Sequence, residues 1–147
     1  MQYGMLTEKG SMFIQYSEFL YLDENRLSGS LPMQLKDCTS LVDLRLRMNS
    51  FASTIPNQWV SLKNLQTLIL DEANLRGTIP ELFNQMRQLE TLQIFKNEFT
   101  GPLPRSLGEV SALSTCHTSE CATYSSSTPS NLILTVCLCF YRSYKYL

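Results

Sequence analysis

The chain has 147 residues, enough for one small domain, and its 12 basic and 13 acidic side chains give a formal net charge of −1 at pH 7. The charges are interspersed and form no basic stretch, which argues against nucleic-acid binding. The sequence contains no glycine-rich phosphate loop, nucleophile elbow or metal-binding motif, so we expect no enzyme, cofactor or metal site.

Residues 1–17 are the first segment in chain order, and they differ from the later part of the chain. They lack the apolar stretch of a secretory signal peptide. Ile14 fits the apolar spacing of the later repeats, but Ser11 and Ser17 stand where leucine is expected. We therefore expect the first repeat to have a poor neighbour on its N-terminal side.

A phrase that recurs every 24 residues begins near residue 18. Its four copies start at Leu20, Leu44, Leu68 and Leu92, and a proline ends each copy. A fixed period of this length is typical of a stacked solenoid. One coil cannot bury its apolar face alone, so at least three coils must stack to form a core. The sequence predicts a solenoid of about four coils over residues 18–115.

Each copy begins with the pattern of a β-strand. In the second copy Leu44 and Leu46 alternate with Arg45 and Arg47, the period of two that indicates a strand with one buried face. Successive copies should place their strands side by side in a curved parallel sheet on the concave face of the solenoid.

An asparagine comes after the strand in three of the four copies. A side-chain amide at this point can hydrogen-bond backbone groups of adjacent turns that would otherwise be buried without partners. The residues concerned are Asn25, Asn49 and Asn97. The third copy has Ala73 in this place, with Asn74 one position late, so we expect a local weak point there.

The rest of each copy carries a glycine, a proline and apolar residues at every third position. The glycines, at positions 29, 77 and 101, fit a backbone that takes an unusual dihedral angle, and Ser53 replaces the glycine in the second copy. A period of three predicts short 3₁₀ turns rather than an α-helix on the convex side. The apolar positions are Leu35, Cys38 and Leu41; Trp59, Leu62 and Leu65; Phe83, Met86 and Leu89; Leu107, Val110 and Leu113.

The C-terminal part of the chain divides into two segments. Residues 116–131 are rich in serine and threonine and are expected to form a linker. Residues 132–147 begin with an apolar run of ten residues, shorter than the roughly 20 that a membrane-spanning helix needs. Three interpretations stay open: a cap on the end of the solenoid, membrane contact through a lipidated Cys137 or Cys139, or non-native coding sequence beyond a missed splice site.

The Leu-x-Gly-x-Ile-Pro phrase on a 24-residue period resembles the plant-type leucine-rich repeat of receptor-like kinases, receptor-like proteins and polygalacturonase inhibitors. The run Leu35-Lys-Asp-Cys-Thr-Ser-Leu41 is similar to the family's Leu-Gly-Asn-Cys-Thr-Ser-Leu. The resemblance covers residues 18–115. It implies a leucine-rich repeat solenoid and a location at the cell surface or outside the cell. It also draws attention to Cys116 and Cys121, since family members can carry a disulfide-bearing cap there.

Two absences count against secretion of the chain as given. Beside the missing signal peptide, no Asn-x-Ser/Thr glycosylation site occurs, and Asp37 replaces the asparagine that usually precedes the cysteine of the family's run. Both absences fit a fragment or an intracellular relative. The spacing of His117 and the cysteines matches no zinc-finger pattern, and Cys38 is expected to be a buried free thiol.

Side chains that point away from the core should form columns, because equivalent positions on stacked strands lie side by side. The four columns are Phe19, Asp43, Thr67 and Thr91; Tyr21, Arg45, Ile69 and Gln93; Asp23, Arg47, Asp71 and Phe95; Glu24, Met48, Glu72 and Lys96. The alternating charges of the third column have two interpretations: an ion ladder that supports the sheet, or part of a recognition surface.

We take the concave face as the candidate binding site, because tyrosine and arginine are favoured in binding hot spots and the concave face of a solenoid is its usual binding surface. The candidate ligand-binding residues are Phe19, Tyr21, Asp23, Arg45, Arg47, Met48, Ile69, Asp71, Gln93, Phe95 and Lys96.

The sequence thus predicts a module that binds a protein or peptide, with low affinity because four coils offer little area. The family resemblance implies a fragment or short relative of a receptor in signalling or defence. Two alternatives stay open: a secreted inhibitor of a glycosidase such as polygalacturonase, or a truncated gene product without independent function. Membrane contact of the chain itself is left open.

Overall fold

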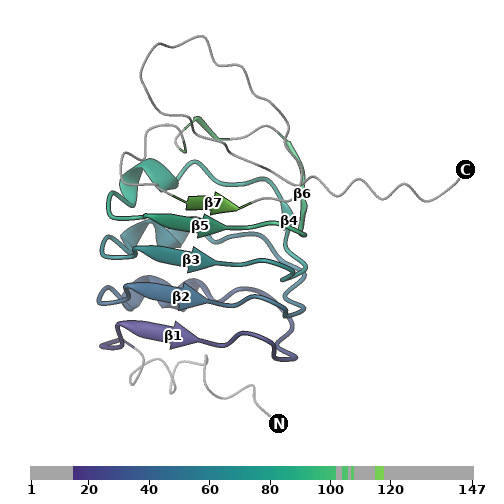
Figure 1. The fold of residues 1–147 in the computed structure, drawn as a ribbon, viewed down its shortest axis with the longest axis horizontal. Coiled ribbons are helices and arrows are strands. Elements are labelled where there is room, and N and C mark those ends of the chain that lie inside the picture. Colours follow the sequence, from purple (N-terminus) through teal and green to yellow (C-terminus); the bar gives the residue numbers. More distant parts are fainter. Residues whose placement is uncertain (1–14, 102–103, 106, 108–114, 118–147) are drawn as a thin grey trace, which may run out of the picture.

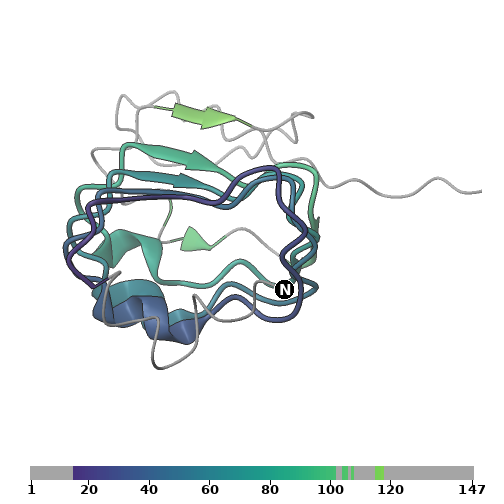
Figure 2. The same ribbon diagram turned by 90° about the horizontal axis from the view of Figure 1, so that it is seen from below.

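A computed structural model describes residues 15–101, 104–105, 107 and 115–117 of the chain (Figure 1). The described chain winds into a stack of coils. Short strands lie on one side of the stack and 3₁₀ helices on the other, as the view along the stack shows (Figure 2). Both the predicted solenoid and the predicted division of each coil into a strand side and a 3₁₀ side are confirmed.

Five strands form one parallel sheet in the order β1-β2-β3-β5-β7. They span Phe19–Tyr21 (β1), Asp43–Arg45 (β2), Thr67–Ile69 (β3), Thr91–Gln93 (β5) and Thr115–His117 (β7). Leu20 lies opposite Leu44, Leu44 opposite Leu68, and Leu68 opposite Leu92. The 24-residue period of the sequence is therefore the register of the sheet.

Strand β7 extends the sheet past the expected end of the solenoid. Its residue Cys116 lies opposite Leu92 of β5, one more period along the chain. The sequence pattern assigns residues 116 and 117 to the serine- and threonine-rich linker. The structure pairs them instead, because the free edge of β5 offers backbone groups that a further strand can satisfy. The cysteines at 121, 137 and 139 and the apolar tail lie outside the described residues.

A second, two-stranded parallel sheet joins the third and fourth coils. It consists of β4 (Arg76–Gly77) and β6 (Glu98–Phe99), and an isolated bridge between Ser28 and Ser50 occupies the corresponding place in the first two coils. This sheet is absent from the sequence prediction, because strands of two residues are too short for an alternating apolar pattern.

The convex side carries the 3₁₀ helices η1 (Met33–Asp37), η2 (Asn57–Ser61) and η3 (Phe83–Gln85). Pro32 and Pro56 directly precede η1 and η2, and each accepts the first hydrogen bond of its turn. The apolar residues at every third position are buried as expected, among them the fully buried Trp59, whose indole N–H donates to the Pro32 carbonyl at 3.0 Å. Val110 and Leu113 lie outside the described residues.

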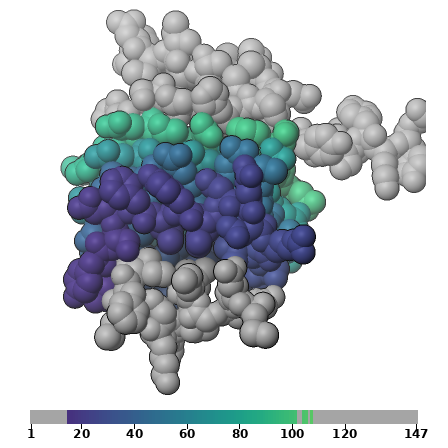
Figure 3. Space-filling model, turned by 60° about the horizontal axis from the view of Figure 1, so that its bottom comes forward, coloured from purple at the N-terminus to yellow at the C-terminus, as the bar shows by residue number. Residues whose placement is uncertain are grey.

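The core lies between the strands and the 3₁₀ helices and is most complete in the inner coils. Leu44 and Leu46 of the second coil are fully buried, whereas their counterparts Leu20 and Leu22 in the first coil are only partly buried. The first coil forms one end of the described stack (Figure 3). Among the described residues, its strand leucines are less buried than those of the other coils.

The asparagines fulfil the predicted role in the inner coils. The amide of Asn49 donates to the carbonyl of Leu22 in the preceding coil, and its oxygen accepts from the backbone N–H of Leu27. At Ala73, where a weak point was expected, backbone hydrogen bonds replace those of the missing asparagine side chain. An asparagine at position 73 would accept from the N–H of Phe51, and here the Ala73 carbonyl accepts from that N–H instead. The Ala73 N–H in turn donates to the side-chain oxygen of Asn97.

In the second coil Ser53 stands where the other coils have glycine, and a neighbouring residue takes the positive φ. Gly29, Gly77 and Gly101 all have a positive φ, whereas in the second coil it is Ala52, one position earlier, that takes a φ of 43°. The hydroxyl of Ser53 then accepts a hydrogen bond from the Leu31 N–H at 2.9 Å. The departure from the repeat changes the local backbone and leaves the stacking in place.

Gly77 should be the least replaceable of these glycines. Its φ is +81°, and a Cβ added there would lie 2.8 Å from the methyl carbon of Thr54 on the neighbouring coil, while a Cβ on Gly29 (φ +89°) would meet nothing within 4 Å. We expect Gly77→Ala to lower the free energy of unfolding by about 2–4 kcal/mol and Gly29→Ala by about 1–2 kcal/mol.

Chemical denaturation of both variants measures this difference. Adding Thr54→Ser, which deletes the clashing methyl group, to Gly77→Ala should bring its cost down to that of Gly29→Ala. Equal costs for the two single variants would show that the methyl contact has no effect.

Candidate ligand-binding face

The candidate site is the outward surface of the five-stranded sheet, which we call the sheet face. It comprises the outward side chains of β1, β2, β3 and β5 and of the residues directly after these strands. The register places Tyr21 opposite Arg45 and Arg45 opposite Ile69, so the predicted second column is confirmed. Phe19, Asp43, Thr67 and Thr91 form the first column in the same way.

The predicted site residues differ in how much of each side chain a ligand could touch. Phe19, Tyr21 and Met48 are 56%, 53% and 40% exposed, which is a large fraction for apolar side chains. Lys96 is also exposed. Half-buried are Asp23, Arg45, Arg47, Ile69, Gln93 and Phe95. Asp71 is only 2% exposed, so its assignment to the ligand-binding set is corrected: a ligand on the sheet face cannot reach it.

A cluster of Phe19, Tyr21, Asp43 and Arg45 forms the most ordered part of the sheet face. The Asp43 carboxylate accepts from Arg45 Nη2 at 2.7 Å and from Arg45 Nε at 3.0 Å, and also from the Tyr21 hydroxyl at 3.1 Å. The Arg45 guanidinium carbon lies 4.6 Å from the centre of the Tyr21 ring, within cation–π distance. The Phe19 and Tyr21 ring centres are 6.2 Å apart.

Asp43 is the organising residue of this cluster. It is buried beneath the cluster, and its hydrogen bond to Arg45 is the main reason that the pKa of Arg45 is raised. Tyr21 as a whole is exposed, but desolvation of its hydroxyl and then the hydrogen bond to Asp43 raise its pKa. Asp43 belongs to the first column by its sequence position, but it is not one of the predicted ligand-binding residues. The sequence does indicate that Asp43 and Arg45 can interact, because residues two apart on one strand point to the same side of the sheet.

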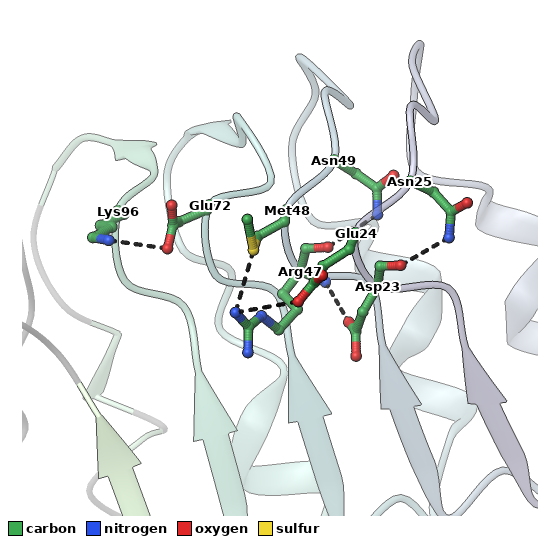
Figure 4. A network of polar contacts seen from close by, with 8 residues as sticks. All are labelled: Asp23, Glu24, Asn25, Arg47, Met48, Asn49, Glu72 and Lys96. Atoms are coloured by element: carbon green, nitrogen blue, oxygen red, sulfur yellow. Dashed lines mark hydrogen bonds and ion pairs between the residues drawn. The ribbon is translucent and has the colours of Figure 1, made fainter.

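Of the two interpretations of the third column, the ion ladder is wrong. Asp23 accepts a hydrogen bond from the backbone N–H of Arg47 at 2.8 Å, and Asp71 accepts one from the backbone N–H of Phe95 at 3.0 Å. The guanidinium of Arg47 pairs with Glu24 at 3.8 Å instead of with either aspartate (Figure 4). The aspartates therefore satisfy backbone groups of the next coil, which is a structural role.

A repeated turn at the strand ends explains this arrangement. The fourth-column residues Glu24, Met48, Glu72 and Lys96 all have a φ between 51° and 55°. The turn directs the N–H of Glu24 to the carbonyl of Arg47, and that of Met48 to the carbonyl of Asp71. Because the strand ends here, a short carboxylate just before the turn can reach the backbone of the next coil. Lys96 and Glu72 form a 3.0 Å ion pair between the equivalent turns of the third and fourth coils (Figure 4).

Asp71 should make the stability of the fold depend on pH. Burial raises its pKa from an ordinary value of 3.8 to about 7, although the hydrogen bond from Phe95 and the charge of Arg47 act in the opposite direction. Between these two values the folded state holds a proton that the unfolded state releases. The stabilisation by protonated Asp71 is therefore complete below about pH 4 and is lost as the pH rises through about 7.

Asp71→Asn tests this, since asparagine keeps an oxygen that can accept from Phe95 but does not titrate. From pH 5 to pH 8 we expect the wild type to lose about 1–3 kcal/mol of unfolding free energy more than the variant does. Urea denaturation across this pH range measures the difference. Identical profiles for the wild type and Asp71→Asn would refute the assignment.

A hollow of about 1070 Å³ lies between segments 24–34 and 51–58 of the first two coils and borders the sheet face at Glu24. Its walls include the core side chains of Leu31, Phe51 and Ile55. We attribute the hollow to the incomplete burial of the first coil, and we keep the sheet face as the candidate site.

Within the described ranges, no group of three histidine, cysteine or carboxylate side chains is arranged to hold a metal ion. In the same ranges, no helix combines the length and the apolar character that crossing a membrane requires. Cys38 is a buried free thiol as expected, and burial raises its pKa.

Comparison with known proteins identifies the repeats. The model of the Leucine Rich Repeat family matches residues 64–86, the end of the second coil and most of the third. The ectodomain of the Arabidopsis receptor kinase HAESA, solved with the peptide hormone IDA and a co-receptor, is 34% identical over 71% of this chain, with a TM-score of 0.67. The chain belongs to the plant-type leucine-rich repeat family.

Two further leucine-rich repeat ectodomains from Arabidopsis thaliana are similarly related. That of the membrane receptor kinase GASSHO1/SCHENGEN3, in complex with CASPARIAN STRIP INTEGRITY FACTOR 2, is 33% identical over 68% of this chain, with a TM-score of 0.66. That of the receptor kinase SOBIR1 is 30% identical over 70% of this chain, with a TM-score of 0.64. A search of curated proteins found no match.

These relatives are longer than this leucine-rich repeat chain. It spans 18% of the HAESA ectodomain, 12% of the GASSHO1/SCHENGEN3 ectodomain and 55% of the SOBIR1 ectodomain. The predicted fold class, a leucine-rich repeat solenoid with a parallel sheet and 3₁₀ turns, is confirmed by these likenesses and by the structure.

Proposed function

We propose that this leucine-rich repeat chain binds a peptide or a protein segment on its sheet face and acts through that binding, without catalysing a reaction. The observation that carries the proposal is the pair of exposed aromatic rings, Phe19 and Tyr21, beside the fixed guanidinium of Arg45. Aromatic and arginine side chains dominate binding hot spots. Two of the related ectodomains, HAESA and GASSHO1/SCHENGEN3, were solved with a peptide hormone and with CASPARIAN STRIP INTEGRITY FACTOR 2, which favours a ligand of the peptide class.

The geometry of the sheet face supports ligand binding better than it supports catalysis. The sheet face is an open surface, and its carboxylates are engaged with Arg45, with Lys96 or with backbone N–H groups. None of the described site residues combines a nucleophile with a neighbouring base in an enclosed pocket, which most catalytic sites require. The ordered cluster around Asp43 instead suits binding, because side chains held in place before binding lose little conformational entropy.

The test compares two exposed apolar side chains on opposite sides of the molecule. Phe19 lies on the sheet face and Met33 on the convex side, and they are 56% and 49% exposed. A phage-displayed library of short random peptides is selected against the immobilised chain, and the affinity of each recovered peptide is measured by isothermal titration calorimetry. We expect Phe19→Ser to weaken binding about tenfold or more and Met33→Ser to change it less than about twofold.

Circular dichroism of both variants checks that they fold. Equal affinities of the wild type and Phe19→Ser for every recovered peptide would exclude the sheet face as the binding surface.

A further inference from the structure

Every basic side chain among the predicted ligand-binding residues of the sheet face has a carboxylate partner. Arg45 is held by Asp43 with its Nη2 at 2.7 Å, Lys96 pairs with Glu72 at 3.0 Å, and Arg47 lies 3.8 Å from Glu24. The strongest of these pairs is the first, in which the carboxylate is buried and accepts from two guanidinium nitrogens. A ligand carboxylate that drew Arg45 away would leave Asp43 buried with its main partner lost.

The sheet face therefore presents no excess of positive charge. Its three basic residues are matched by Asp43, Glu72 and Glu24, and Asp23 adds a further carboxylate in the first coil. An acidic ligand would thus meet a surface that is neutral to slightly negative at neutral pH. Electrostatic steering favours ligands of the opposite sign, which here means neutral or basic ones.

Because its charged side chains are paired with one another, the sheet face can contact a ligand mainly through apolar side chains. Phe19, Tyr21 and Met48 are its most exposed large apolar side chains among the described residues. The Tyr21 ring is fixed by its hydroxyl bond to Asp43 and by the Arg45 guanidinium over one face, and the Phe19 ring lies beside it. A flat and immobile ring surface of this kind accepts a second aromatic side chain by offset or edge-to-face packing.

We infer that the ligand of the sheet face is an extended peptide without net negative charge, which inserts an aromatic side chain against Phe19 and Tyr21 and does not use Arg45 or Arg47 to bind a carboxylate. The inference rests on the proposed function, because it names the chemistry of the ligand that this face would take. The aromatic contact supplies the affinity, and the internal ion pairs exclude acidic competitors.

The test uses synthetic peptide pools in place of an identified ligand. The pools contain short peptides, acetylated and amidated at their ends, that are acidic, neutral or basic, each with or without aromatic residues. Retention on the immobilised full chain is measured at about 50 mM and about 300 mM NaCl. We expect the neutral and basic aromatic pools to be retained about tenfold more than the acidic aromatic pool and the neutral pool without aromatics. Retention of the neutral aromatic pool should change less than about twofold with salt.

Three variants separate the outcomes. Phe19→Ser should abolish retention of the neutral aromatic pool, whereas the convex-side control Met33→Ser should leave it unchanged. Arg47→Gln is used to test whether any retention of the acidic pool depends on this guanidinium. Preferential retention of the acidic pool, lost at high salt and in Arg47→Gln, would overturn the inference; if Phe19→Ser also reduced that retention, the proposed function would survive. If no pool bound the wild type better than Phe19→Ser, the inference and the proposed function would fail together.

Discussion

Replacing Leu70 by alanine should lower the free energy of unfolding by about 2–5 kcal/mol, a large fraction of the stability of a domain of this size. Leu70 of the third coil is fully buried, and its backbone N–H donates to the Gln93 carbonyl of the fourth coil at 2.8 Å. Alanine would leave a cavity that the stacked coils on either side cannot close. Because each coil depends on its neighbours, the loss should affect the whole stack.

Denaturant titration followed by circular dichroism measures this cost. The matched control is Ile69→Ala, one residue earlier at the end of β3, where the side chain is half-buried on the sheet face. We expect the control to cost about 1 kcal/mol. A cost for Leu70→Ala no larger than that of Ile69→Ala would contradict the alternation of buried and outward residues on which the register depends.

Asn97→Ala should be about as damaging, at about 3–5 kcal/mol, for a different reason. The Asn97 side chain is 4% exposed, and its oxygen accepts from the N–H groups of Ala73 and Leu75. Its amide donates to the carbonyls of Leu70 at 2.8 Å and Ile94 at 3.1 Å. Alanine would leave several buried backbone groups without partners, and each costs about 1–3 kcal/mol.

Asn25→Ala is the control for this variant. Asn25 occupies the equivalent position in the first coil, where it is exposed and donates only to nearby carbonyls of its own coil. Thermal melts should show a loss below about 1 kcal/mol for Asn25→Ala. Comparable losses for the two variants would mean that the amide acts within its own coil and not as a link between coils. The printed bonds of Asn97 join the third and fourth coils, so its removal should weaken the contact between these two coils.

Much of the fold could be predicted from the sequence, because a solenoid repeats short-range information. The 24-residue period alone gives the register, as the pairing of Leu20 with Leu44 and of Leu44 with Leu68 shows. The spacing of three on the convex side gives the 3₁₀ turns, since eclipsed side chains at every third position are a property of that helix. The two-residue strands β4 and β6 were missed because a pattern needs more residues than they contain.

The site was only partly predictable. Membership of the columns can be read from the period, and the neighbouring positions of Tyr21, Arg45 and Ile69 are confirmed. The partner of each charged group is not set by the period. An alternation of Asp23, Arg47 and Asp71 fits an ion ladder, yet backbone N–H groups compete for the same carboxylates and bind them here.

The sequence by itself determined the repeat, the side of each strand that faces the core and the family, because these depend on residue types at fixed spacing. Only the tertiary structure decided that Asp71 is buried, that Asp43 holds Arg45 and Tyr21 together, and that the basic side chains of the sheet face are already paired. These features depend on how the chain turns after each strand and on which donors the next coil brings within about 3 Å, and hydrogen bonding is decided at that distance.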